Sequence, residues 1–255
     1  MVRRRTTHRR DADAGRRDGR LVVFGANAVR ELLRAGDPPD RVYVTRGPRE
    51  QELAGAARER GVPVEAVDRA TLDGLAGSPH HQGAVAVAPP FRYAALEQLL
   101  EPGCGSALVL DGVQDPRNLG GILRTARALG VGGVVLPRDR SVAVTPVVVA
   151  ASAGLLFGLP VAQVPNLVRA MEQLKEAGFW LVGLVPRNGV PLDRFEPPSR
   201  PAVVAGGEGE GLRSLVGRTC DFAVSIPMAP GVESLNVGVA VAIALHAVVP
   251  RGRRA

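Results

Sequence analysis

Strand-like and helix-like segments alternate along almost the whole of this chain. The sequence ALVLDG, from Ala107, is a continuous apolar run, which is the pattern of a strand in a parallel sheet buried on both faces. Helical segments separate it from further apolar runs, which include VGGVVLP, FWLVGLV and PAVVAGG. Such alternation predicts an α/β fold with a mainly parallel sheet.

The alternation is interrupted once, which predicts two α/β domains. Residues 21–93 contain short strands and helices, with Asp68 as the expected cap of one helix. Residues 94–105 hold a short helix and the turn-rich EPGCGS, and we interpret them as a linker. Residues 106–250 carry the second, longer alternation. We therefore expect a small N-terminal domain and a larger C-terminal one.

The net charge of +7 lies at the two ends of the chain. Residues 1–20 hold eight Arg and three Asp, and Arg251, Arg253 and Arg254 add three positive charges, so the body between them is close to neutral. We interpret residues 1–20 as a disordered Arg-rich tail, because they lack the apolar region of a secretory signal. Flexible arginines suit a phosphate backbone, but a solvated tail has the same composition. Charge alone leaves both readings open.

Composition argues against several other classes of protein. The apolar run from Val237 to Val249 is too short for a membrane span, which needs about 20 residues. Two cysteines, Cys104 and Cys220, fit a reducing compartment and predict neither a disulfide framework nor a cysteine metal site. His80 and His81 are adjacent and should point in different directions, which disfavours a shared metal. We expect a cytoplasmic protein that binds neither membrane nor metal.

Three segments combine polar or glycine residues with an expected strand end, where ligands of open parallel sheets gather. The first is DGVQDPRNLGGILRTARALG, from Asp111. Asn118 can cap the helix that follows, and Arg117 and Arg124 could face a phosphate near the helix start. A capped helix with solvated arginines is the alternative.

The second segment is VVAGGEGEGL, from Val203, where a glycine-rich turn joins a strand to a helix. Its spacing is not that of a dinucleotide fingerprint, and Glu208 and Glu210 would repel a pyrophosphate. Two carboxylates in a glycine loop suit a cationic ligand or a close backbone contact. A tight turn with exposed acids remains open.

The third segment is IPMAPGVESLNVGVA, from Ile226, which opens the last helix. Glu233, Ser234 and Asn236 come just before the helix, and Ser and Asn are common helix caps. The helix itself is apolar on every face, so we expect protein around it. Taken alone, this segment favours a cap over a site.

Together and in this order, the three segments resemble the signature motifs of the SpoU (TrmH) family, part of the SPOUT superfamily. Its members are S-adenosylmethionine-dependent RNA ribose 2′-O-methyltransferases, and the resemblance covers about residues 106–249. FGANAVRELL and HQGAVAV in the first part are similar to the family's small L30e-like substrate-binding domain. The arrangement resembles that of members acting on a guanosine of bacterial 23S rRNA.

The resemblance implies a SPOUT α/β-knot, that is, a deep trefoil knot in the C-terminal domain, and an obligate homodimer. It also explains an apolar last helix, which would pass through the knot and into the subunit interface. S-adenosylmethionine would be held in a bent conformation by backbone groups around Gly206, Ile226 and Leu235.

The same resemblance implies roles for five side chains. Arg124 matches the catalytic arginine, and because a guanidinium stays charged, it is better suited to stabilising an alkoxide or orienting a phosphate than to acting as a base. Asn118 would position Arg124 or the ribose, and Glu208 would anchor the arginine or a loop. Ser234 and Asn236 would orient substrate and cofactor.

The chain departs from the motifs at two positions and leaves the substrate open. Gly238 stands where Ser is usual, and Gly207 where Ser or Ala is common, which puts local contacts in doubt. Ribosomal RNA is the expected partner. The alternatives are the same reaction on tRNA, an antibiotic-resistance methylation of rRNA, or an RNA-binding protein without activity.

Overall fold

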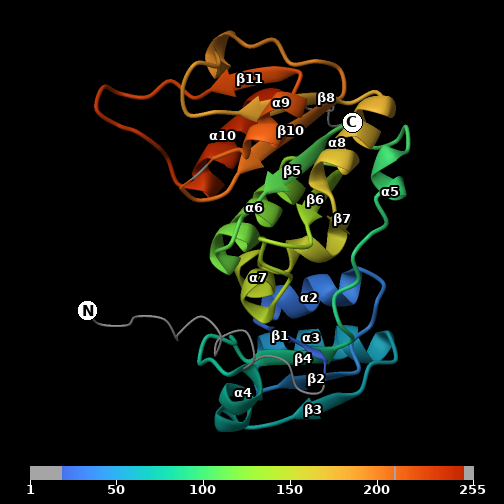
Figure 1. Cartoon of the computed structure of the whole chain (residues 1–255). Coiled ribbons are helices and arrows are strands. Elements are labelled where there is room, and N and C mark those ends of the chain that lie inside the picture. Colours follow the sequence, from blue (N-terminus) through green and yellow to red (C-terminus); the bar gives the residue numbers. More distant parts are fainter. Residues whose placement is uncertain (1–18, 210, 250–255) are drawn as a thin grey trace, which may run out of the picture. The chain divides into compact units, whose positions relative to one another are not determined.

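The computed structural model describes residues 19–209 and 211–249, which form two compact units (Figure 1). The N-terminal unit comprises the chain up to Arg92 together with Val144–Phe157. The C-terminal unit comprises Tyr93–Ala143 and the chain from Gly158. Most of the predicted N-terminal tail and the three C-terminal arginines lie outside the described residues, as does Glu210.

The N-terminal unit is built on a four-stranded mixed sheet. Its strand order is β1 (Leu21–Phe24), β4 (Ala84–Ala88), β2 (Arg41–Val44) and β3 (Val64–Ala66). Strand β4 runs antiparallel to both neighbours, and only β2 and β3 are parallel. The helices are α2 (Ala26–Arg34), α3 (Pro48–Glu59), α4 (Arg69–Ala76) and α7 (Pro146–Ala151), and α7 packs against β1.

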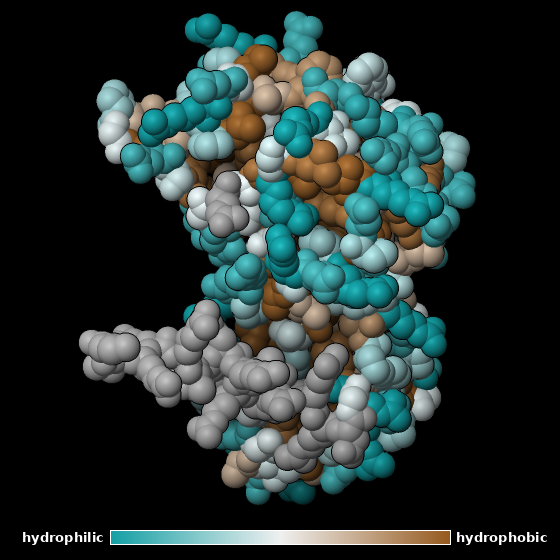
Figure 2. Space-filling view, viewed as in Figure 1, coloured by the Kyte–Doolittle hydropathy of each residue, from teal (hydrophilic) through white to brown (hydrophobic). Residues whose placement is uncertain are grey.

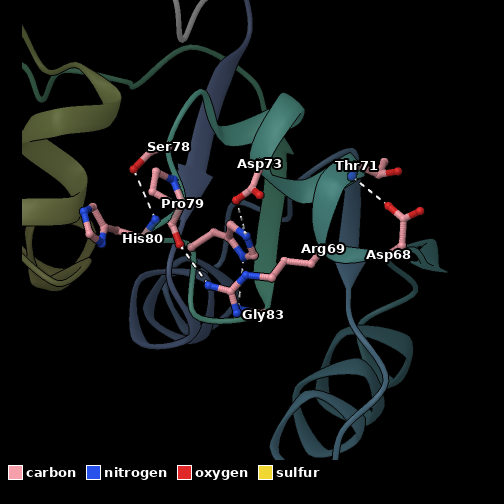
Figure 3. A network of polar contacts seen from close by, with 9 residues as sticks. Asp68, Arg69, Thr71, Asp73, Ser78, Pro79, His80 and Gly83 are labelled. Carbon is pink, nitrogen blue, oxygen red and sulfur yellow. Dashed lines mark hydrogen bonds and ion pairs between the residues drawn. The ribbon is translucent and has the colours of Figure 1, made fainter.

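Three polar contacts shape helix α4 and the loop after it (Figure 3). Asp68 caps the helix as predicted, because its carboxylate accepts a hydrogen bond of 2.7 Å from the Thr71 amide. Hydrogen bonding with the Thr71 side chain and with its amide lowers the pKa of Asp68. His81 is fully buried, with Nε2 3.0 Å from Asp73 and Nδ1 accepting from the Gly83 amide. Since Nδ1 is the acceptor, Nε2 carries the proton. His80 is exposed, so the two histidines do point differently.

The C-terminal unit contains a seven-stranded sheet in which every strand pair is parallel, which confirms the predicted mainly parallel sheet. Its strand order is β7 (Val161–Val164), β6 (Gly133–Pro137), β5 (Ala107–Asp111), β10 (Pro201–Gly206), β8 (Trp180–Leu184), β11 (Phe222–Ser225) and β9 (Val190–Pro191). The helices are α5 (Glu97–Leu100), α6 (Pro116–Ala128), α8 (Leu167–Glu176), α9 (Ser214–Thr219) and α10 (Val237–Val248). Strands β5 and β6 are buried along their whole length.

Strand β10 fixes the chain path at the centre of this sheet. It inserts between β5 and β8, so segments about a hundred residues apart are hydrogen-bonded neighbours, Gly206 opposite Asp111. The turn after β10 crosses other backbone closely. A Cβ on Gly206 would lie 2.0 Å from the Gly211 carbonyl carbon, and one on Gly207 would lie 2.2 Å from the Gly112 oxygen. Only glycine fits here, which accounts for Gly207 where Ser or Ala is common.

The backbone limits the length of two helices. Helix α7 ends at Ala151, because Ala153 and Gly154 adopt positive φ angles of 52° and 82°. A short 3₁₀ turn, Leu155–Gly158, follows. Helix α9 begins at Ser214, after the glycine-rich turn.

Helix α10 packs against α6 and β10, but one of its faces is open in the single chain. Val239 is 50% exposed and Ile243, one turn further, is 39% exposed. The expectation that protein surrounds this helix is therefore not met within one chain. Brown apolar side chains reach the surface of the C-terminal unit among teal polar ones (Figure 2).

Both cysteines are free thiols in the C-terminal unit. Burial raises the pKa of Cys104, and burial together with the nearby Asp221 charge raises the pKa of Cys220 to about 11. Both are therefore neutral near pH 7. In the described chain, no helix has both the length and the apolar character that a membrane crossing requires.

Candidate active site

Two of the three motif segments meet where β5 and β10 end. Because the strands are parallel and adjacent, their carboxyl ends lie at the same edge of the sheet. Asp111 ends β5 and Gly206 ends β10, and the Gly207 amide donates to the Asp111 carbonyl at 2.9 Å. The arginine segment and the glycine segment are thus joined by their backbones.

A chain of side-chain hydrogen bonds connects all three segments. Asn118 Nδ2 donates to Glu208 Oε1 at 2.7 Å, and Asn236 Nδ2 donates to Asn118 Oδ1 at 3.1 Å. The second carboxylate oxygen of Glu208 accepts from the Gln114 amide at 3.3 Å. Residues 90 and 118 positions apart in sequence therefore form one polar cluster.

The orientation of both amides follows from their partners. Asn236 Oδ1 caps helix α10 by accepting from the Gly238 and Val239 amides, so its Nδ2 must face Asn118. Asn118 then presents its oxygen to Asn236 and its nitrogen to the Glu208 carboxylate, which can only accept. The helix cap thereby sets the direction of every bond in the chain.

This arrangement corrects the role expected for Asn118 as a helix cap. Asp115 caps α6 instead, accepting from the Arg117 amide at 2.7 Å. Pro116 occupies the first helical position, which is typical of a helix whose cap immediately precedes it. Asn118 lies inside the first turn, and its side chain is free to bind Glu208. Gly238 stands where Ser is usual, and a Cβ added there would lie 3.2 Å from Asn236 Oδ1.

A pocket of about 460 Å³ lies beside this cluster. It is formed by the ends of β8, β10 and β11 and by the start of α10. The expected cofactor-binding residues Gly206, Ile226 and Leu235 all line it, and so do Glu208, Ser234 and Asn236. Its size is in the range for a small-molecule site, and it combines apolar walls with glycine backbone.

The pocket suits an elongated molecule with both apolar and polar parts. Ile226, Met228 and Leu235 offer apolar surface, while glycines 206, 207, 209 and 211 leave backbone groups accessible without side chains. These features fit an adenosine and an amino-acid moiety such as S-adenosylmethionine carries. No group of three or more His, Cys, Asp or Glu that could hold a metal occurs among the described residues.

Arg124 lies outside the hydrogen-bonded cluster. It is exposed on α6, does not line the pocket, and forms no hydrogen bond or ion pair with the described part of the chain. The expected contact between Glu208 and this arginine is absent, because the Glu208 carboxylate is used by Asn118 and Gln114. Arg124 is therefore available to a substrate.

Ser234 and Glu233 also lie at the surface. Ser234 is exposed and lines the pocket without capping α10. The Glu233 carboxylate forms an exposed ion pair with the Arg187 guanidinium, at 3.7 Å. Of the polar residues in the third segment, Ser234 and Asn236 face the pocket.

One buried ion pair in this region was not anticipated. The Asp111 side chain is completely buried, and it accepts 2.6 Å and 2.9 Å hydrogen bonds from Arg213 Nε and from the Arg213 amide. This pair ties the end of β5 to the chain that follows the glycine turn. An aspartate ending an apolar strand was the available signal, but nothing in the sequence identified its partner.

Comparisons with known proteins agree with this geometry. Residues 105–246 match the SpoU rRNA Methylase family, and residues 22–94 match the RNA 2′-O ribose methyltransferase substrate binding domain. A Staphylococcus aureus protein named as a TrmH family tRNA/rRNA methyltransferase is 39% identical over 89% of this chain and 94% of its own.

Solved structures of the same class are also similar. The SpoU methyltransferase AviRb from Streptomyces viridochromogenes, in complex with AdoMet, has a TM-score of 0.78 and 26% identity, covering 93% of this chain and 94% of its own. An RNA 2′-O ribose methyltransferase has a TM-score of 0.74 and 25% identity, covering 94% and 90%. The predicted SPOUT α/β-knot fold of the C-terminal unit is thereby confirmed. The chain belongs to the SpoU (TrmH) family of RNA 2′-O-ribose methyltransferases.

Proposed function

We propose that this protein methylates the 2′-hydroxyl of a guanosine ribose in 23S rRNA, using S-adenosylmethionine and acting as a cytoplasmic homodimer. The observation that carries the proposal is the hydrogen-bonded chain Asn236–Asn118–Glu208 at the rim of the pocket. It brings residues of all three motif segments to one place, on the domain whose α6 also carries an arginine without a partner in the described chain.

S-adenosylmethionine fits the pocket and supplies an electrophilic methyl group on a sulfonium centre. Backbone groups around Gly206, Ile226 and Leu235 would hold it, and the Ile226 and Leu235 side chains would add apolar contact. Ser234 lines the same pocket and would orient the cofactor or the ribose by its hydroxyl. The AdoMet-bound AviRb structure supports this choice of cofactor.

The cluster and Arg124 would act on the ribose. As the 2′-oxygen bonds to the methyl carbon, the bond from that carbon to the cofactor sulfur would break, and the hydroxyl proton would pass to an RNA phosphate oxygen or to water. The Arg124 guanidinium would stabilise the negative charge that develops on the oxygen. Asn118 and Asn236 each keep one amide N–H beyond the bonds described above, and these orient the ribose. Glu208 holds Asn118 in the direction that this requires.

The N-terminal unit supports an rRNA substrate. Residues 22–94 match a substrate-binding domain of RNA 2′-O-ribose methyltransferases, and family members acting on tRNA often lack such a domain. We therefore assign residues 21–93 to RNA binding and residues 106–250 to catalysis.

The experiment is methyl transfer from radiolabelled S-adenosylmethionine to three separate RNAs: 23S rRNA, 16S rRNA and total tRNA. The labelled nucleotide is then mapped, and we expect a 2′-O-methylguanosine in 23S rRNA only. Label confined to tRNA would refute the rRNA assignment and leave the reaction intact. Absence of label from all three RNAs, both free and in ribosomal subunits, would refute the enzyme.

A further inference from the structure

A short basic loop follows β6 at the same sheet edge as the site. Its sequence is RDRSVA, residues 138–143, and we refer to it as the basic loop. Arg138, Asp139 and Arg140 are exposed, and neither guanidinium forms a hydrogen bond or ion pair with any described residue. Asp139 is the only acid within the loop. The loop therefore carries two guanidinium groups that have no partner in the described part of the protein.

The basic loop is fastened to the turn that carries the catalytic cluster. The Val113 carbonyl accepts two bonds, from the Val142 amide at 3.0 Å and from the Ser141 hydroxyl at 3.2 Å. The next residue, Gln114, donates its amide to Glu208, which in turn holds Asn118. Each link is a hydrogen bond or a peptide bond, so the position of the loop is fixed relative to Asn118.

The backbone at Arg140 has an unusual conformation. Its φ angle is +62°, in the left-handed region that non-glycine residues seldom adopt. Glycine would fit this conformation with less strain, yet an arginine occupies it. A backbone bond at the other end anchors the loop, since the Arg138 amide donates to the Val164 carbonyl at 2.8 Å.

The order of strands places the basic loop away from the cofactor pocket. The pocket is formed at the ends of β8, β10 and β11, whereas β6 lies on the other side of β5 in the order β6-β5-β10. No residue of the basic loop lines the pocket. Helix α6, which begins after the same turn, carries two further exposed arginines, Arg117 and Arg124. Neither has a partner among the described residues. Asp115, the cap of α6, is the acidic residue just before them.

We propose that Arg138 and Arg140 bind backbone phosphates of the RNA strand adjacent to the methylated nucleotide. A planar guanidinium matches a phosphate oxygen pair, and a polymer that places one ribose at Asn118 must continue past the site. The basic loop then holds the neighbouring phosphodiesters on the side of β5 opposite the cofactor. This inference rests on the proposed RNA substrate and assigns it a binding site outside the pocket.

The test is a salt titration of RNA binding. A fluorescein-labelled single-stranded oligoribonucleotide of mixed sequence is titrated by anisotropy with the wild-type chain, with Arg138→Gln/Arg140→Gln, and with Arg138→Lys/Arg140→Lys. Arg218→Gln is the matched control, because Arg218 is exposed, has no partner in the described chain, and lies near the start of β11, at the opposite sheet edge.

We expect the Gln variant to bind at least about threefold more weakly at low salt. Its slope of log affinity against log salt should fall by about 0.7 for each phosphate that the variant no longer neutralises. The Lys variant should retain most of the slope, and Arg218→Gln all of it. S-adenosylmethionine affinity, measured by calorimetry, should be unchanged in every variant, which separates phosphate binding from a change of structure.

Two results would overturn the inference: a Gln variant with the wild-type slope, or one that loses S-adenosylmethionine binding as well. The titration needs no turnover, so its failure is distinguishable from that of the proposed function. If the wild-type chain transfers no methyl group but the slope still depends on Arg138 and Arg140, the phosphate site stands without the reaction.

Discussion

At the scale of single residues, Arg124 is the group on which the proposed chemistry depends. It is exposed, unpaired in the described chain and outside the pocket, so removing its guanidinium should not disturb the cofactor. We expect Arg124→Ala to lower kcat by about 10²–10³-fold, the usual loss when a donor to a developing oxyanion is removed. S-adenosylmethionine affinity should stay near the wild-type value by calorimetry. Unchanged turnover would remove Arg124 from the mechanism.

Glu208 gives a second prediction, which tests the donor-to-acceptor direction of the hydrogen bonds in the cluster. Both carboxylate oxygens accept from N–H donors, on Asn118 and on Gln114. Glu208→Gln keeps the shape but turns an NH₂ group toward one of these donors, and the lost hydrogen bond, which is exposed, is worth about 0.5–1.5 kcal/mol. We expect kcat/KM to fall by roughly threefold to tenfold. Gln114→Ala is the control, because it retains the backbone amide, and equal activity in both variants would contradict this role.

At the scale of elements, the Asp111–Arg213 pair joins β5 to the segment before α9. Arg213→Ala leaves a completely buried carboxylate with one amide donor. Because Arg213 is itself partly exposed, we expect a loss of about 2–3 kcal/mol in the free energy of unfolding, below the ~3–5 found for a fully buried pair. Urea denaturation measures it.

Two further variants test whether that loss of unfolding free energy comes from the ion pair. Arg218→Ala, on the helix α9 that Arg213 precedes and without a partner in the described chain, should be neutral. Asp111→Asn combined with Arg213→Ala should be more stable than Arg213→Ala alone, because it removes the unpaired charge. If Arg213→Ala unfolds at the wild-type midpoint, the ion pair does not hold these elements together.

The elements also show which parts of the fold local sequence can predict. The buried strands β5 and β10 were recognisable as continuous apolar runs, and Asp68 as a cap. The insertion of β10 between β5 and β8 was not, because it depends on contacts between residues about a hundred positions apart. The two-residue strand β9 is too short to show a pattern.

The site was predictable to a similar degree. Asn118, Glu208, Ser234 and Asn236 came together only through the family resemblance. Alone, the segments of Asn118, Ser234 and Asn236 favoured helix caps, and the Glu208 loop suited a cationic ligand or a close backbone contact, with a tight turn left open. Pro116 could have identified Asp115 as the cap of α6 and so freed Asn118 for another role. Arg213 carried no local signal, because its partner lies 102 residues away.

At the scale of the whole molecule, we expect α10 to link the proposed site to assembly of a homodimer. Its first turn is capped by Asn236, which also orients Asn118, while the open face carrying Val239 and Ile243 begins in that same turn. An exposed apolar face on a helix without a polar side is a typical subunit interface. A partner covering this face would therefore hold the cap, and with it the direction of the catalytic hydrogen bonds.

This gives the last prediction, on the oligomeric state. Light scattering should show the wild-type chain at about twice its 26.7 kDa mass, and Ile243→Glu should dissociate it, because a carboxylate would be buried without a partner. The matched control is Leu215→Glu on α9, since Leu215 is 55% exposed but lies off the α10 face. A monomeric wild-type chain, or equal dissociation by both variants, would contradict an α10 interface. Dissociation by Ile243→Glu with full methyl transfer would instead show that one chain holds a complete site.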